Sequence, residues 1–557
     1  MLSIKYSEFY KYKEMVDFLF EAKKEYSKFI ELKALVTSPE EREVYLVAIT
    51  DPETGLAEQK GAYFVQACVH GQEGAGTTEA LYLIKQLLEE EKYRELLKKI
   101  VFYIIPRVNP DGAEYAIAKQ ASIRSRFMET YGKNRLIPKD LNGDGYILSM
   151  RWEDPAGLMK EDKVDPRIMV KRQPGDKGPF YQVITEGIIE GYEEAPFNLK
   201  EIKYQRTVDF NRNWPINWNP ENPVSSLYPF SEPEMQAVGE FMVKHPNIFA
   251  GIDLHCGCNG ILRPSMKSDS EMNQEDLEFI LNIGKVAEDM TGFPLIHERE
   301  YKEPWRQPMI LHGNSNDWSY FKMGISHYVI ELGNGFNCAG ISTSEYLNAD
   351  TLTRETNYMR KVLSYHDERR SRLFVPWEKF QHPQLGLVEI GGLVQGNGYY
   401  MYPPIMKEIA PKVSEFLIYH AKRYPELIVS NVEVVEINTS VAEKHKNDER
   451  HNNDGEKIYR IRASVGNIGG FGTKVMKAGG SMDSNYPVIA NLILPEGAEI
   501  LSRVKSFEIG SLGALGDSEI VEWFVKLPAY MVGKEPKQLF IEASHPRAGI
   551  YKFAITL

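Results

Sequence analysis

Cysteine is scarce in this chain of 557 residues, which has only four, at Cys68, Cys256, Cys258 and Cys338. So few thiols argue against a disulfide scaffold of the kind that stabilises small extracellular domains. Long apolar runs are missing as well. No stretch reaches the roughly 18 uncharged apolar residues that a membrane-spanning helix needs. We therefore expect no membrane partner.

The N-terminus lacks the uncharged apolar core that a secretion signal requires. Within its first twenty residues stand Glu8, Lys11, Lys13, Glu14 and Asp17. We expect a cytoplasmic protein on this ground. Export by a route that needs no leader stays open.

Positive charge is in deficit, with 66 Lys and Arg against 78 Asp and Glu and a net charge of −12. The acidic residues are spread along the chain and form no tail. Nucleic acid is not an expected partner, because binding phosphates requires a basic surface. The share of apolar residues, 43%, is typical of globular proteins, and the length predicts more than one domain.

Apolar runs alternate with helical patterns along the first part of the chain. We expect strands at 44–50, 63–71, 100–108, 248–255 and 327–332, and helices at 77–90 and 274–290. Strands that are apolar throughout and alternate with helices indicate an α/β fold. Its sheet should be mixed but mostly parallel, with helices on both faces.

Two changes of character divide the chain. Residues about 127–205 are rich in glycine, proline and charge, which indicates an insertion in the first domain. Beyond residue 425, β runs separated by turn signals predict an antiparallel β-sandwich. The predicted domains are therefore 1–425, which carries the insertion, and 426–557.

Polar clusters follow two of the predicted strands. VQACVHGQEG places His70 and Glu73 after one strand, and GIDLHCG places His255 at the end of another. Open α/β sheets bind ligands at the carboxyl ends of their strands. Two histidines and one carboxylate form a catalytic zinc set that leaves a coordination position open. We expect one Zn²⁺ per chain, and we expect the neighbouring Cys256 and Cys258 to be core residues and not ligands.

Three further motifs follow one another along the chain. RVNPDG (107–112) ends a strand, VDFNRNW (208–214) follows the insertion, and NDWSYFKMGISHYVIEL spans 316–332. Together with the two histidine motifs they resemble the zinc carboxypeptidase family, typified by pancreatic carboxypeptidase A. The resemblance covers roughly residues 1–340 and a closing helix near 405–425.

The resemblance implies roles for residues outside the metal set. Asp209 matches the carboxylate that hydrogen-bonds the first ligand histidine and fixes its ring. Asn211 and Arg212 match the pair that grips the terminal carboxylate of the substrate, a task that suits a guanidinium fork. Asn316 stands where the family sets its side-chain preference.

The resemblance also implies the catalytic groups. Glu331 lies fourteen residues after Asp317, as the family's general base does, and would take a proton from zinc-activated water. Arg124 falls where the family stabilises the oxyanion, and Arg126 is a nearby alternative.

The pattern departs from the family at two places. Gln72 stands where the family's archetypes carry a basic residue between the first two ligands. The family's mobile tyrosine would fall near Met309, and no tyrosine is there. Contacts to the upstream part of the substrate, and strict exopeptidase action, are therefore left open.

A second metal motif lies in the insertion. DLNGDG (140–145) has the opening of a calcium loop, with Asp140, Asn142 and Asp144 at ligand positions. The twelfth position of the loop, where a bidentate carboxylate belongs, is Arg151. A Ca²⁺ site and a plain Asx-rich turn both remain open.

The leading hypothesis is a metallocarboxypeptidase that hydrolyses a C-terminal peptide or isopeptide bond. Its substrate would be a peptide or an acyl-amino acid with a free carboxylate. One alternative is an amidase, deacylase or cell-wall peptide hydrolase of the same fold. Another is a non-catalytic binding protein whose β-sandwich docks a partner. The sequence predicts no oligomeric state.

Overall fold

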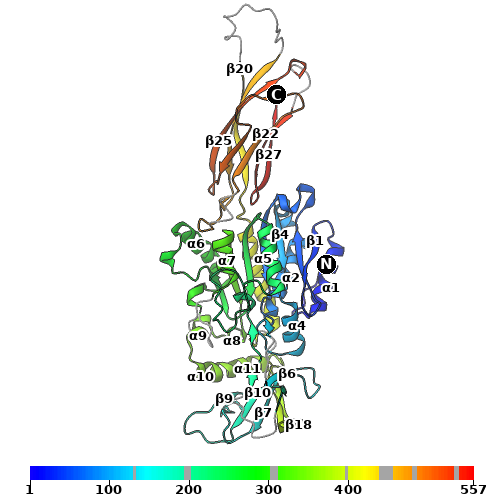
Figure 1. The fold of residues 1–557 in the computed structure, drawn as a ribbon, viewed down its shortest axis with the longest axis vertical. Coiled ribbons are helices and arrows are strands. Elements are labelled where there is room, and N and C mark those ends of the chain that lie inside the picture. Colours follow the sequence, from blue (N-terminus) through cyan, green and yellow to red (C-terminus); the bar gives the residue numbers. More distant parts are fainter. Residues whose placement is uncertain are drawn as a thin grey trace, which may run out of the picture.

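The computed structural model describes residues 1–128, 133–192, 202–301, 312–394, 399–437, 456–479, 486–531 and 538–557. An eight-stranded sheet forms its centre (Figure 1). In spatial order its strands are β1 (Ile30–Thr37), β2 (Glu43–Ile49), β4 (Ile100–Ile105), β3 (Gly61–Ala67), β14 (Ile248–His255), β17 (Ser326–Leu332), β15 (Asn259–Arg263) and β16 (Leu295–His297).

Helices cover both faces of this sheet. The helices of this part of the molecule include α1 (Tyr12–Glu25), α2 (Gly74–Glu89), α3 (Arg94–Lys99), α4 (Pro110–Lys119), α5 (Pro233–Lys244), α6 (Gln274–Thr291), α11 (Met359–Glu368) and α12 (Met406–Ala421). Four short helices are α7 (Ser315–Trp318), α8 (Gly335–Cys338), α9 (Thr343–Asn348) and α10 (Thr351–Thr353). No helix among the described residues is both long and apolar enough to cross a bilayer.

Alternate side chains of the central strands enter two separate cores. Tyr63 and Val65 of β3 pack into one core with α1, α2, α6 and α12, whereas Ala62 and Phe64 pack into the other with α5. Successive side chains of a strand point to opposite faces, so a strand covered by helices on both sides is buried along its whole length and is mostly apolar. This explains why β3 is buried at every position.

The prediction of a mixed, mostly parallel sheet is confirmed. β4, β3, β14 and β17 run parallel to one another, and β15 pairs in parallel with β16. The pairings of β1 with β2, β2 with β4 and β15 with β17 are antiparallel. The carboxyl ends of β3, β14 and β17 therefore lie at one edge of the sheet. Helix α2 begins at Gly74, earlier than the predicted 77. A Cβ on Gly76 would stand 2.9 Å from the Leu254 carbonyl oxygen, so the missing side chain lets the helix start against β14.

The predicted insertion supplies only some of the strands of a second sheet. In spatial order its strands are β18 (Phe374–His382), β19 (Gly386–Leu393), β7 (Ser149–Glu153), β10 (Tyr181–Thr185), β8 (Met159–Glu161) and β9 (Met169–Lys171). Smaller pairings join β6 (Arg135–Pro138) to β11 (Gly187–Glu190) and β12 (Lys203–Tyr204), and β5 (Arg126–Phe127) to β13 (Thr207–Val208). The pairing of β19 with β7 includes an ion pair between Glu389 and Arg151, whose Oε2 and Nε atoms lie 2.8 Å apart.

The C-terminal part consists of two four-stranded antiparallel sheets, as predicted. One contains β20 (Leu427–Ile437), β21 (Lys457–Asn467), β25 (Asp517–Leu527) and β23 (Glu499–Ile500). The other contains β24 (Ser506–Gly510), β22 (Val488–Ile493), β26 (Gln538–His545) and β27 (Gly549–Thr556). They share an apolar core around the fully buried Trp523.

The sandwich and the second sheet lie at opposite ends of the molecule (Figure 1). The buried Arg547 of the sandwich donates from Nε to the Ile248 carbonyl oxygen at 3.0 Å, and Phe471 joins the core of the first domain. Ile248 opens β14, whereas His255 ends it. The sandwich therefore docks at the edge of the sheet away from the predicted metal ligands. The domain limits 1–425 and 426–557 stay a prediction.

Candidate metal centre

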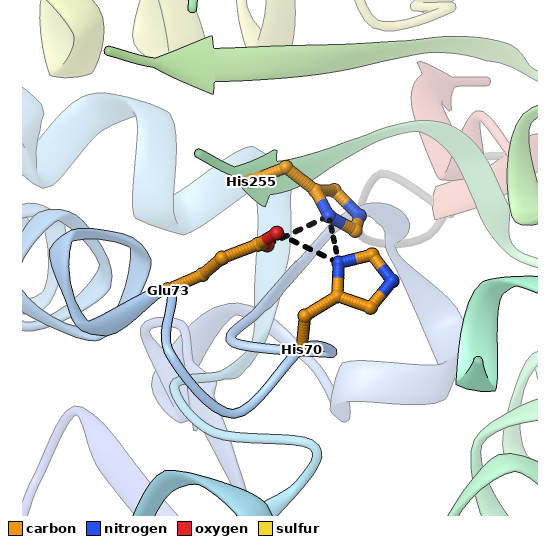
Figure 2. A group of neighbouring side chains, drawn as sticks. All are labelled: His70, Glu73 and His255. Atoms are coloured by element: carbon orange, nitrogen blue, oxygen red, sulfur yellow. Dashed lines mark hydrogen bonds and ion pairs between the residues drawn. The ribbon is translucent and has the colours of Figure 1, made fainter. Parts of the chain in front are cut away.

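His70, Glu73 and His255 come together at the carboxyl ends of β3 and β14 (Figure 2). The Nδ1 atom of His70 lies 2.8 Å from Glu73 Oε1, and that of His255 lies 2.9 Å from Glu73 Oε2. The two Nδ1 atoms are 3.1 Å apart. Within the described part of the chain, no other three His, Cys, Asp or Glu side chains form such a group.

The donor set fits zinc. Two ligand bonds of about 2.0–2.1 Å at a tetrahedral angle place the donor atoms about 3.3 Å apart. The three spacings of this cluster, 2.8, 2.9 and 3.1 Å, are close to that value. Imidazole and carboxylate are also the ligand types of catalytic zinc sites. These three residues can therefore hold a single divalent ion.

Electrostatics keep the carboxylate of the cluster ionised. Burial raises the pKa of Glu73, but the neighbouring His70 and His255 outweigh it and lower that pKa to about 2. Burial lowers the pKa of His70, while the carboxylates of Glu73 and Asp209 outweigh it and raise that pKa overall. An ionised carboxylate is the form that a metal ligand requires.

Asp209 and Arg124 surround the first ligand. Asp209 Oδ1 lies 2.9 Å from His70 Nε2, the ring nitrogen that faces away from the cluster. Arg124 donates from Nε to Asp209 Oδ2 at 3.0 Å, and its Nη1 lies 3.5 Å from Glu73 Oε1. The alternative Arg126 instead pairs with Glu232 and Glu234. The arrangement favours Arg124 over Arg126 as the residue beside the metal.

Glu331 lies next to His255 on the neighbouring strand. The two residues are partners in the parallel pairing of β14 with β17, and both are buried. A Cβ on Gly257 would stand 3.1 Å from Glu331 Oε2 and 2.5 Å from the Tyr301 hydroxyl. The absent side chain of Gly257 thus leaves room for the carboxylate at the edge of the site.

Asn211 and Arg212 follow Asp209 on a short turn. The Asn211 backbone donates to Asp209 Oδ1 at 2.8 Å, and its side-chain Oδ1 accepts from the Ser315 backbone at 2.9 Å. Arg212 donates from Nη1 to the Asn211 carbonyl oxygen at 2.6 Å. This turn joins the predicted carboxylate-binding pair to Asp209, the carboxylate that contacts His70.

Asn316 lies fully buried beside a carboxylate that the sequence did not single out. Its Nδ2 donates to Glu298 Oε2 at 3.2 Å. Burial raises the pKa of Glu298 well above its usual range, and Asp317 adds to the rise while Arg212 opposes it. Burial also raises the pKa of Asp317, to about 6. The surroundings of Asn316 are therefore acidic.

Two other residues were missed. Asp253, buried on the strand of His255, accepts from Gln66 Nε2 at 2.7 Å and from the Ser315 hydroxyl. The hydroxyl of Tyr399 accepts from Arg124 Nη1 at 2.9 Å across 275 residues of chain. An acid in the middle of an apolar strand was a usable signal for Asp253. Nothing local marks Tyr399.

The calcium prediction is not supported. In the DLNGDG turn, Asp140 accepts from the backbone of Gly143 and Gly145 at 2.7 and 2.9 Å, and Asn142 accepts from that of Asp144 at 3.0 Å. Backbone N–H groups thus occupy the oxygens of a plain Asx-rich turn.

Two further sequence expectations concern residues near the ligands. Cys256 and Cys258 are buried among apolar side chains and are not part of the metal cluster. Met309 lies outside the described residues.

Two family models match the chain. The family model for zinc carboxypeptidases matches residues 15–352, more than half of the chain, and a domain of unknown function matches 443–556. Carboxypeptidase A6 of Mus musculus is 34% identical over 140 residues, which are 23% of this chain and 31% of that protein. The chain thus spans about a third of that relative.

Two further similarities are more distant. Carboxypeptidase B of Astacus astacus is 20% identical over 287 residues, which are 49% of this chain and 70% of that protein. A solved carboxypeptidase A of Helicoverpa armigera is similar with a TM-score of 0.38 and 16% identity, covering 65% of this chain and 74% of the other. By the family match over more than half its length, the chain belongs to the zinc carboxypeptidase family.

Proposed function

We propose that the protein is a zinc-dependent metallocarboxypeptidase that hydrolyses a C-terminal peptide or isopeptide bond. The observation that carries the proposal is the convergence of His70, Glu73 and His255 on one point, with Glu331 on the adjacent strand. Zinc held by the three ligands would lower the pKa of a bound water to about 7 and polarise the scissile carbonyl.

Glu331 is the proposed general base. Its carboxylate lies at the buried edge of the site, where it can accept a proton from the attacking water and return it to the leaving amine. Arg124, beside Glu73, offers a guanidinium to the negative charge that develops on the carbonyl oxygen. Asn211 and Arg212 bind the free carboxylate of the leaving residue, which restricts cleavage to the chain end.

The variant Glu331→Gln tests this assignment, because it removes the proton acceptor and keeps the shape. We expect it to bind zinc as the wild type does and to lose hydrolysis of C-terminal residues by about 10²–10⁴-fold. The exposed Glu221, changed to Gln, is a control with the same change of charge. A zinc-loaded Glu331→Gln protein that keeps the full rate would refute the proposed mechanism.

A further inference from the structure

A cavity of about 860 Å³ lies beside the candidate metal centre. Gln72, which stands between His70 and Glu73 in the sequence, lines it together with Arg124. Since Arg124 Nη1 lies 3.5 Å from Glu73 Oε1, the cavity begins one side chain away from the metal cluster. Its volume is in the range of pockets that bind small ligands, about 300–1,000 Å³.

The cavity lies on the Arg124 side of the metal cluster. Among its described lining residues are Gln72 and Arg124 but not Asn211, Arg212 or Asn316. Under the proposed function, on which this inference rests, Asn211 and Arg212 hold the residue that leaves. The other side of the scissile bond then extends past Arg124, so the cavity is placed to receive the acyl part of the substrate.

Three separate parts of the chain build the cavity wall. Lys171 comes from β9 in the second sheet, Arg354 from the turn of helix that follows α10, and Tyr399 from the segment before α12. The Tyr399 hydroxyl accepts from Arg124 Nη1 at 2.9 Å, which joins this wall to the metal centre. The inserted sheet therefore contributes a side chain to the substrate cleft.

The charge of the cavity is opposite to that of the whole chain. Its described lining carries three cations, Arg124, Lys171 and Arg354, and one anion, Glu355. The chain as a whole has a net charge of −12. A cleft in which one sign of charge predominates attracts ligands of the other sign.

Lys171 is the cation most open to a ligand. Its side chain is exposed, and it forms no ion pair with any residue whose position is described. Arg354, by contrast, already donates from Nη1 to the Ala349 carbonyl oxygen. An ammonium group on a cavity wall binds a carboxylate as a point charge, and the contact strengthens where water is excluded.

We propose that this cavity binds the acyl part of the substrate and selects acyl groups that carry carboxylates, such as peptides with Asp or Glu upstream of the scissile bond. Lys171 is its specificity-determining residue, and Arg354 supports it. Phe336 and Tyr346 are among the apolar residues of the lining.

The first test compares hydrolysis of two peptides that share the same leaving residue. One has two Glu residues on the acyl side and the other has two Gln residues. We expect the wild type to prefer the Glu peptide about tenfold in kcat/KM, and the preference to shrink at high salt. Lys171→Gln should lose most of it, while Lys163→Gln, an exposed lysine of the same insertion outside the cavity, should keep it.

The second test needs no turnover. Calorimetry measures binding of the acyl products acetyl-Glu-Glu and acetyl-Gln-Gln to the wild type and to Lys171→Gln. Tighter binding of the Glu product that depends on Lys171 supports the inference, and equal binding of both products overturns it. If the protein binds the Glu product in this manner but cleaves neither peptide, the inference about the cavity stands and only the proposed hydrolytic function is contradicted.

Discussion

His70 and His255 bring their Nδ1 atoms to within 3.1 Å of each other, although 185 residues separate them in the chain. β3 and β14, the strands that precede and carry them, pair in parallel, so their carboxyl ends meet at one edge of the sheet. Glu73 places one carboxylate oxygen against each ring. The topology of the sheet thus assembles a metal site from two distant segments.

Asp209 should tune the affinity for zinc through its hydrogen bond to His70 Nε2. We expect Asp209→Asn to weaken zinc binding by about 10–100-fold, because the amide no longer supports the basicity of the ring. Competition with a chromogenic chelator measures this affinity. Asp144→Asn, the same change on the exposed Asx-rich turn, should leave it unaltered. Equal zinc affinity in both variants would remove Asp209 from the proposed role.

Substitutions of Arg212 and of Arg124 should affect different kinetic parameters. We expect Arg212→Lys to raise KM for substrates with a free C-terminal carboxylate, because a point charge replaces the bidentate fork. Arg124→Lys should mainly lower kcat, because it alters a contact that strengthens in the transition state. Steady-state kinetics on one substrate decide this, and the same pattern in both variants would contradict the assignment.

Ser315 should act on the substrate-binding pair from a distance. Its hydroxyl donates to the buried Asp253, and its backbone N–H donates to Asn211 Oδ1 at 2.9 Å. We expect Ser315→Ala to raise KM several-fold with little change in kcat, because the backbone that holds Asn211 loses the hydroxyl bond that fixes it to Asp253. Unchanged kinetics in a stably folded Ser315→Ala protein would show that Asn211 is held by other contacts.

Acid should destabilise the fold through His420. Burial lowers the pKa of this histidine from 6.5 to about 3, with help from His327 and Arg423. Between these pH values the unfolded chain takes up a proton that the folded chain does not bind. The contribution of the neutral His420 to the free energy of unfolding is therefore complete above pH 6.5 and is lost as the pH falls toward 3.

The expected slope for His420 is about 1.4 kcal/mol per pH unit within that window. Denaturant titrations of the wild type and His420→Gln between pH 4.5 and 7 measure it. The variant cannot titrate, so its stability should vary less with pH by about this amount. Parallel pH profiles would show that His420 does not titrate as described.

Arg547 should fasten the sandwich to the first domain. Besides Ile248, its guanidinium donates to the Gly324 carbonyl oxygen at 3.3 Å and to that of Met323 at 2.5 Å. We expect Arg547→Ala to lower the temperature of unfolding by several degrees and to make the junction sensitive to protease, because buried carbonyls lose their donor. The exposed Arg503, changed to Ala, should do neither.

The sequence predicted those parts of the molecule that local patterns encode. Strands buried on both faces are mostly apolar, and polar residues at or after their ends mark the edge where ligands gather, so His70 and His255 could be found. Pairing between distant segments leaves no such pattern. The joining of β19 to β7, and the contact of Tyr399 with Arg124, depend on chain reversals that no local residue signals.

The sequence also did not predict which polar groups are buried. Glu298 stands within ERE, which has the composition of a solvated surface, yet the fold buries its carboxylate beside Asn316. Charged residues are rarely buried, so composition favours exposure for such a position. Only the packing of β16 against β15 and the position of α7 place it inside.

The most direct measurement is anomalous diffraction at the zinc absorption edge from crystals of the zinc-loaded protein. The account predicts one strong peak per chain, in contact with the Nδ1 atoms of His70 and His255 and with the Glu73 carboxylate. A peak elsewhere, or two imidazoles directed at different ions, would contradict it.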